Sequence, residues 1–88
     1  MQILVNRSFD KDVRRASDRN ALVALREVIR SVEQAQSLRE IPNLRRIRGE
    51  GHYYRIRLGD YRIGIALQKN VVTFVRFLHR KDIYKYFP

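Results

Sequence analysis

The segment that decides the fold is His52–Leu67, with the sequence HYYRIRLGDYRIGIAL. Its two halves, His52–Leu58 and Tyr61–Leu67, alternate in the manner of a sheet and flank Gly59-Asp60, which suits a tight two-residue hairpin turn. This turn fixes the register and predicts four cross-strand pairs: Leu58 with Tyr61, Arg57 with Arg62, Ile56 with Ile63, and Arg55 with Gly64.

The predicted register sorts the hairpin side chains into two faces, because side chains alternate along a strand. The apolar face, which helices should cover, holds Tyr54, Ile56, Leu58, Tyr61, Ile63, Ile65 and Leu67. The other face holds Tyr53, Arg55, Arg57, Arg62, Gly64 and Ala66. Like charges opposite one another destabilise a hairpin, so an anion between Arg57 and Arg62 would relieve repulsion. The alternative is that these arginines form an ordinary solvated face.

A third strand is expected at Val71–His79 after a turn at Lys69-Asn70. A two-residue turn places Val71, Thr73, Val75, Phe77 and His79 on the same face as Arg62. A three-residue turn would place Arg76 and Arg80 there instead, and the nearly continuous apolar strand leaves both registers open.

The N-terminal half predicts a strand over residues 2–6 and two helices. The first helix starts from Ser8 as N-cap, carries an apolar stripe of Phe9, Val13 and Ala16, and places Asp10 and Asp12 in its first turn. After a break at residues 17–20, a second helix over residues 20–37 carries the stripe Leu22, Leu25, Ile29 and Val32. Residues 44–51 form a basic connector, and residues 81–87 a short amphipathic tail.

Composition limits the range of functions. The 88 residues suit a single small domain, and the absence of Cys excludes disulfides, Cys-type zinc sites and thiol nucleophiles. The two histidines cannot hold a metal alone, so we expect no metal and no cofactor. No signal-like or membrane-spanning run is present, and a soluble cytoplasmic protein with no membrane partner is expected.

The net charge of +10 points to an anionic ligand. Fifteen of the nineteen cationic side chains are Arg, which suits bidentate phosphate contacts and stacking on bases. Nucleic acid or an acidic protein is therefore the expected partner. His79 is a candidate general acid or base, or an ordinary strand-end residue. Tyr53 is placed to stack on a base, whereas Tyr84 and Tyr86 could simply pin the tail to the sheet.

The runs Tyr54–Ile63 and His79–Tyr84 together resemble the RelE/ParE superfamily of type II toxins, and residues 9–12 and 44–49 also fit. The resemblance implies an α+β fold with an N-terminal strand, two helices on one face of an antiparallel sheet, and a short C-terminal helix. It is greatest to the RelE branch, whose members cleave mRNA in the ribosomal A site without metal, by 2′-hydroxyl attack on the adjacent phosphate.

The resemblance also implies roles for particular residues. Arg55, Arg57 and Arg62 correspond to the phosphate-binding and catalytic cations, Arg80 to a further transition-state cation, and Tyr84 to the aromatic residue that positions or deprotonates the 2′-hydroxyl. His79 is kept as a second candidate base, because some relatives have Lys where this sequence has Arg55 and Arg57, and Arg stays protonated. Additional RNA contacts are expected from Arg45, Arg46, Arg48, Tyr53 and Lys81.

Three functions follow from this comparison. The first is a ribosome-dependent mRNA endonuclease neutralised by a cognate antitoxin. The second is a ParE-like inhibitor of DNA gyrase, a branch in which the catalytic cations and terminal Tyr are usually incomplete. The third is an RNA-binding module without catalysis.

Overall fold

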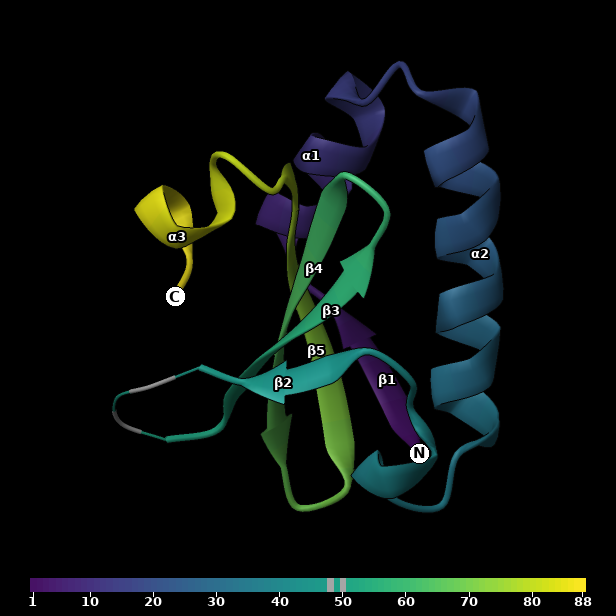
Figure 1. Cartoon of the computed structure of the whole chain (residues 1–88). Helices are drawn as coiled ribbons and strands as arrows, with labels where there is room; N and C mark the ends of the chain where they lie inside the picture. Colours follow the sequence, from purple (N-terminus) through teal and green to yellow (C-terminus); the bar gives the residue numbers. More distant parts are fainter. Residues whose placement is uncertain (48, 50) are drawn as a thin grey trace.

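The computed structural model describes residues 1–47, 49 and 51–88, and Figure 1 shows its helices and strands along the chain. In chain order the elements are β1 (Gln2–Val5), α1 (Arg7–Arg15), α2 (Arg19–Gln34), the 3-10 turn η1 (Leu38–Glu40), β2 (Leu44–Arg46), β3 (Tyr53–Leu58), β4 (Tyr61–Gln68), β5 (Val71–His79) and α3 (Ile83–Tyr86). Among the described residues, no helix is both long and apolar enough to cross a membrane.

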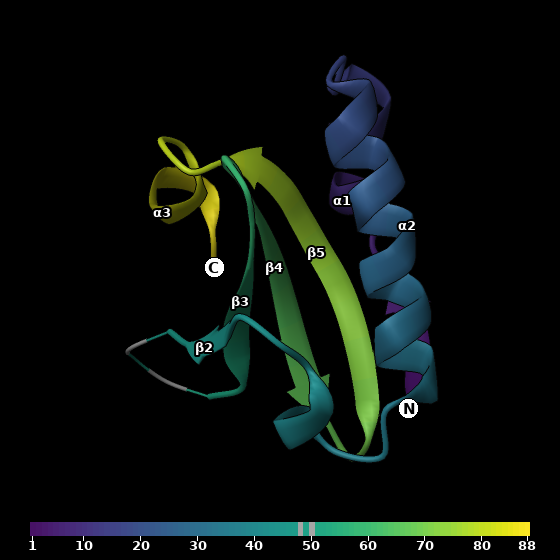
Figure 2. The same ribbon diagram turned by 45° about the vertical axis from the view of Figure 1, so that its right-hand side comes forward.

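The five strands form one sheet in the order β1-β5-β4-β3-β2. The sheet is mixed, because β1 runs parallel to β5 while every other neighbouring pair is antiparallel. Helices α1 and α2 lie on one side of the sheet and α3 lies on the other (Figure 2). The predicted α+β fold is therefore confirmed, with β1 as the departure from a wholly antiparallel sheet.

The hairpin of β3 and β4 has the predicted register, including Arg57 opposite Arg62 and Arg55 opposite Gly64. Gly59 has a φ of 58°, the positive value that the first residue of this kind of two-residue turn requires. The apolar face of the hairpin packs under the two long helices, where Ile56, Ile63 and Ile65 are buried. The alternation of apolar and polar residues, together with the turn, is thus sufficient to place Arg55, Arg57 and Arg62 on the face away from these helices.

The register of β5 is more complicated than either predicted alternative. The turn at Lys69-Asn70 has two residues, and Thr73 lies opposite Ala66 as expected for such a turn. A bulge between Gly64 and Ile65 then shifts the pairing, with Val75 as the extra residue on β5. Beyond the bulge, each β5 side chain lies on the face of the sheet opposite to the one that the two-residue turn predicts. The placement of Phe77 and His79 on the face of Arg62 is therefore wrong.

After the bulge, Arg76 lies opposite Gly64, Leu78 opposite Arg62, and His79 opposite Tyr61. Phe77 turns into the helix-covered core, where it is 2% exposed. Arg76 consequently lies on the same face of the sheet as Arg62. A three-residue turn would also have placed it there, but the cause in this structure is the bulge. The bulge lies next to Gly64, where a residue without a side chain permits the local irregularity.

Three other local expectations are corrected. The connector at residues 44–51 contains strand β2, which pairs with β3. The N-cap of α1 is Asn6, and the Ser8 hydroxyl instead donates to the Val75 carbonyl oxygen at 2.6 Å. Helix α2 begins after the N-cap Asp18 and ends at Gln34, three residues before the predicted end, because Ala35 is extended and buried.

Asp12 does not serve the helix dipole as expected; it closes the edge of the sheet. Strand β1 covers β5 only as far as Phe74, and α1 continues along the same edge. The buried Asp12 carboxylate accepts hydrogen bonds from the Phe77 backbone N–H at 2.9 Å and from Arg76 at 2.7 and 3.1 Å. The hydrogen bond to Asp12 raises the pKa of Arg76 above its usual value.

We expect the substitution Asp12→Asn to lower the free energy of unfolding by about 2 to 4 kcal/mol, measured by urea denaturation. An amide has a single acceptor oxygen and would turn its NH2 donors toward Arg76 or Phe77. The partial exposure of Arg76 keeps the loss below the upper end known for buried ion pairs.

The matched control is Asp10→Asn on the same helix. Asp10 makes an exposed pair with Arg14 at 3.2 Å, so this change should cost no more than about 0.5 kcal/mol. Equal effects of the two substitutions would contradict the role assigned to Asp12.

Candidate functional site

The sheet face opposite α1 and α2, called here the arginine face, carries side chains from four adjacent strands. Arg45 of β2 lies opposite Arg55 of β3, and Arg57 of β3 lies opposite Arg62 of β4. Two like-charged pairs therefore stand side by side. Arg45, Arg55 and Arg57 also line a hollow of about 170 Å³. We call Arg45, Arg55, Arg57, Arg62 and Arg80 the arginine cluster.

Arg62 lies at the centre of the cluster. Its pKa is below the usual arginine value because of partial burial, the neighbouring charges of Arg55 and Arg57, and a smaller contribution from Arg80. Its guanidinium donates to the carbonyl oxygens of Gly59 and Tyr61 at 2.7 and 2.8 Å, so the hairpin turn holds it in place. A bound anion would relieve the repulsion that lowers this pKa.

Arg80 joins the cluster from the end of β5. Its backbone N–H donates to the Asp60 carbonyl oxygen at 2.7 Å, and its Nε lies 3.8 Å from the Asp60 carboxylate. Asp60 was expected only as a turn residue. Its position at the hairpin tip gives it a second function, which is to hold Arg80 next to Arg62.

Tyr84 reaches the cluster from α3. Arg55 Nε donates to the Tyr84 hydroxyl oxygen at 3.3 Å, and the Tyr84 side chain is largely exposed. The predicted residues Arg55, Arg57, Arg62, Arg80 and Tyr84 therefore come together on one open surface. Such a surface can bind a phosphate and stabilise negative charge that develops on it.

The sequence profile of the family described as "ParE toxin of type II toxin-antitoxin system, parDE" matches residues 3–84. The chain belongs to this family of toxins. It is also 36% identical over 89 residues to Toxin RelE3 of Methanocaldococcus jannaschii, with 100% of both chains covered. The resemblance to the RelE/ParE superfamily is confirmed, and the protein is a toxin of a type II toxin–antitoxin system.

Solved structures agree with this assignment. A chain of the RelB–RelE antitoxin–toxin complex from Methanococcus jannaschii superposes with a TM-score of 0.82 at 35% identity, covering 97% of the toxin and 99% of that chain. An archaeal RelE–RelB complex from Pyrococcus horikoshii gives a TM-score of 0.71 at 20% identity, covering 90% and 93%, and shares the fold.

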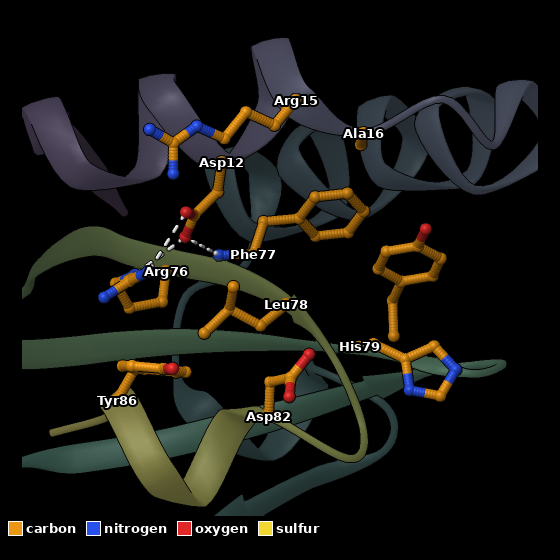
Figure 3. Close-up of a pocket in the computed structure, with 10 residues that line it drawn as sticks. Asp12, Arg15, Ala16, Arg76, Phe77, Leu78, His79, Asp82 and Tyr86 are labelled. Carbon is orange, nitrogen blue, oxygen red and sulfur yellow. Dashed lines mark hydrogen bonds and ion pairs between the residues drawn. The ribbon is translucent and has the colours of Figure 1, made fainter.

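His79 of the toxin is not brought into the arginine cluster. It lies opposite Tyr61, its ring contacts Tyr61 edge to face, and its Nδ1 accepts a hydrogen bond from the Lys81 backbone N–H at 3.2 Å. It lines a different hollow of about 450 Å³ between α1, the edge of β5 and α3, shown in Figure 3. The β5 bulge is the reason, because it turns His79 away from Arg62.

The other residues predicted to contact RNA do not all lie on the arginine face. Tyr53 lies on the arginine face but packs edge to face on Phe87, with ring centroids 5.6 Å apart. Arg46 lies opposite Tyr54 and donates to the Gly51 carbonyl oxygen, so it belongs to the other face. Lys81 is exposed, just after β5. Arg48 lies outside the described residues.

For the toxin, we expect Arg57→Gln to raise the free energy of unfolding by up to about 1 kcal/mol in low salt, because it removes a like charge opposite Arg62. The gain should shrink in about 1 M salt, where the Debye length falls to about 3 Å. Urea denaturation at the two salt concentrations measures both effects.

Arg46→Gln is the matched control, since it removes the same charge from β2 on the opposite face; its stability should change by less than about 0.5 kcal/mol. A loss of stability in Arg57→Gln at low salt would mean that Arg57 supports the fold.

Proposed function

We propose that the toxin is a ribosome-dependent endoribonuclease that cleaves mRNA in the A site and so inhibits translation in the cytoplasm. The convergence of Arg55, Arg57 and Arg62 on one exposed face, with Arg80 and Tyr84 beside them, carries this proposal. Repulsion between Arg57 and Arg62 has no value for stability, so the arrangement is better explained by an anionic substrate. The relative named Toxin RelE3 supports the RelE branch.

The proposed reaction is an in-line displacement at phosphorus. The 2′-hydroxyl oxygen loses its proton and forms a bond to the adjacent phosphorus while the bond to the 5′-oxygen breaks. The products are a 2′,3′-cyclic phosphate and a 5′-oxyanion, which takes up a proton from water to give the 5′-hydroxyl end. Negative charge grows on the phosphoryl oxygens in the transition state. In this proposal Arg57 and Arg62 bind those oxygens from neighbouring strands, and Arg80 adds a third cation from the end of β5, next to Asp60 of the hairpin turn.

Tyr84 takes part in the handling of the 2′-hydroxyl proton in this proposal. The guanidinium groups remain protonated and cannot accept that proton. Tyr84 lies against Arg55, whereas His79 lies elsewhere, so Tyr84 is the titratable side chain that we assign to position or deprotonate the 2′-hydroxyl. We propose that no metal takes part, because a cluster of five cations repels a divalent cation.

The test is cleavage of a defined mRNA on programmed ribosomes, read by primer extension. We expect A-site cuts by the wild-type toxin, a loss of at least about 100-fold in rate for Arg62→Ala, and at least about tenfold for Tyr84→Phe. Arg26→Ala is the control, because Arg26 is exposed on α2 on the other side of the sheet; it should cleave within about twofold of the wild type.

Intact mRNA on active ribosomes would contradict the proposal. The family described as ParE toxin then favours the second candidate, inhibition of DNA gyrase, which a supercoiling assay with the same protein would detect. RNA binding that depends on Arg62 without any cleavage would instead support a noncatalytic module.

We also propose that a cognate antitoxin neutralises the toxin by covering the arginine cluster or displacing Ile83–Phe87. The RelB–RelE complexes among the similar structures support this partner. The exposed cations call for acidic residues, and the buried Ile83 and Phe87 offer apolar positions that a displacing segment would occupy. A disordered acidic segment that folds on binding fits both requirements.

Binding of the antitoxin should therefore weaken with salt less steeply than binding of nonspecific RNA, because apolar burial adds to the charge term. Titrations of the co-expressed, separated antitoxin and of a random RNA across the same salt series measure the two slopes. Equal slopes would show that charge alone holds the complex and would argue against the mixed interface.

A further inference from the structure

The position of Tyr84 needs an explanation beyond its own helix. Helix α3 has four residues, and Tyr84 and Tyr86 on it are 63% and 59% exposed. So short a helix cannot hold its place through its own hydrogen bonds. Other contacts must keep the Tyr84 hydroxyl 3.3 Å from Arg55 Nε.

Two buried side chains at the ends of α3 hold it on the arginine face. Ile83 is fully buried, and Phe87 is 3% exposed. The Phe87 ring lies directly on Gly64: a Cβ on Gly64 would be 2.8 Å from three ring carbons, closer than real Cβ atoms approach. Tyr53 closes one side of the ring with an edge-to-face contact. Gly64 therefore leaves the space in which Phe87 sits.

Gly64 lies at a particular point in the sheet. It stands between Arg55 of β3 and Arg76 of β5, its partners on either side. The two tyrosines of α3 meet these two arginines: Tyr84 contacts Arg55, and the Tyr86 ring lies 5.7 Å from Arg76 Cζ. Two arginines with a glycine between them thus form a notch that receives the chain from Tyr84 to Phe87.

The Arg76 side of this notch is rigid. Arg76 is held by two hydrogen bonds to the buried Asp12, as Figure 3 shows, so it offers Tyr86 a fixed cation. The Arg55 side is open, and there the Tyr84 hydroxyl meets the cluster. The contacts at Phe87 and Tyr86 therefore set where Tyr84 stands.

We propose that Gly64 and Phe87 are positioning residues, which seat α3 so that the Tyr84 hydroxyl lies at Arg55; their catalytic effect rests on the endonuclease activity proposed above. The methyl group of Gly64→Ala would occupy the space of the Phe87 ring and lift it, and Tyr84 would move with it. Misplacement of a reacting group by about 1 Å can cost about 100-fold in rate.

The first arm of the test needs no RNA. The toxin is labelled with 3-fluorotyrosine, and the Tyr84 resonance is assigned with Tyr84→Phe. Gly64→Ala should shift the Tyr84 and Tyr86 resonances while Tyr54 and Tyr61, on the helix-covered face, stay in place. Ala66→Ser, on the same strand and face but two residues beyond Gly64 and opposite Tyr53, should leave the resonances of Tyr54, Tyr61, Tyr84 and Tyr86 unchanged.

The second arm is cleavage on programmed ribosomes. Gly64→Ala should lower kcat at least tenfold with KM within twofold, because the phosphate-binding arginines remain. In a Tyr84→Phe background the same substitution should cost less than twofold, since its effect passes through Tyr84. Adding Phe87→Leu to Gly64→Ala should restore part of the rate by making room for the methyl group.

An unmoved Tyr84 resonance in Gly64→Ala, or an equal loss of rate with and without Tyr84, would overturn the proposal. If Gly64→Ala does not fold, Phe87→Leu alone decides it, because this variant loosens the seat without a clash and should still shift Tyr84. If the wild type cuts no mRNA, both the proposed endonuclease activity and the catalytic effect of Gly64 and Phe87 are wrong. The fluorine spectra still decide whether these two residues position Tyr84.

Discussion

The carboxylate of Asp12 is the interaction on which the rest of the structure depends. Strand β1 ends before it can cover the second half of β5, and that half would present unpaired backbone groups at an open edge. Ser8 and Asp12 of α1 supply the missing partners, to the Val75 carbonyl oxygen and the Phe77 N–H. A helix thus completes the edge of the sheet through its side chains. The same carboxylate fixes Arg76, and through Arg76 the support of α3.

The bulge in β5 divides the strand into two parts with different functions. Before it, Val72 and Phe74 turn into the core beneath the helices. After it, the alternation is offset by one residue, so that Phe77 also reaches the core while Arg76 emerges on the arginine face. Without the offset, Arg76 could not stand beside Gly64. Because of the bulge, Arg76 contacts both Asp12 at the sheet edge and Tyr86 of the C-terminal helix α3.

The part of the fold that depends on local pattern could be predicted from the sequence. The alternation in residues 52–67 and the Gly59-Asp60 turn were sufficient to place Arg55, Arg57 and Arg62 together, because a short turn leaves a single register. The bulge could not be predicted, since six of the nine residues of Val71–His79 are apolar and their pattern tolerates either register. Strand β2 has three residues and is defined by its pairing with β3. The contact of Asp12 with the sheet edge depends on where β1 stops pairing with β5, and local sequence patterns do not determine that pairing.

The opposed arginines of the cluster give the toxin a stability that depends on what it binds. We expect repulsion in the pairs Arg45–Arg55 and Arg57–Arg62 to weaken the sheet, and a bound polyanion would remove that repulsion. Binding and folding are then linked by mass action: a ligand present at 100 times its dissociation constant adds about 2.7 kcal/mol to the stability of the folded state. If the proposed RNA substrate binds this surface, the toxin without a ligand is the form that unfolds most easily.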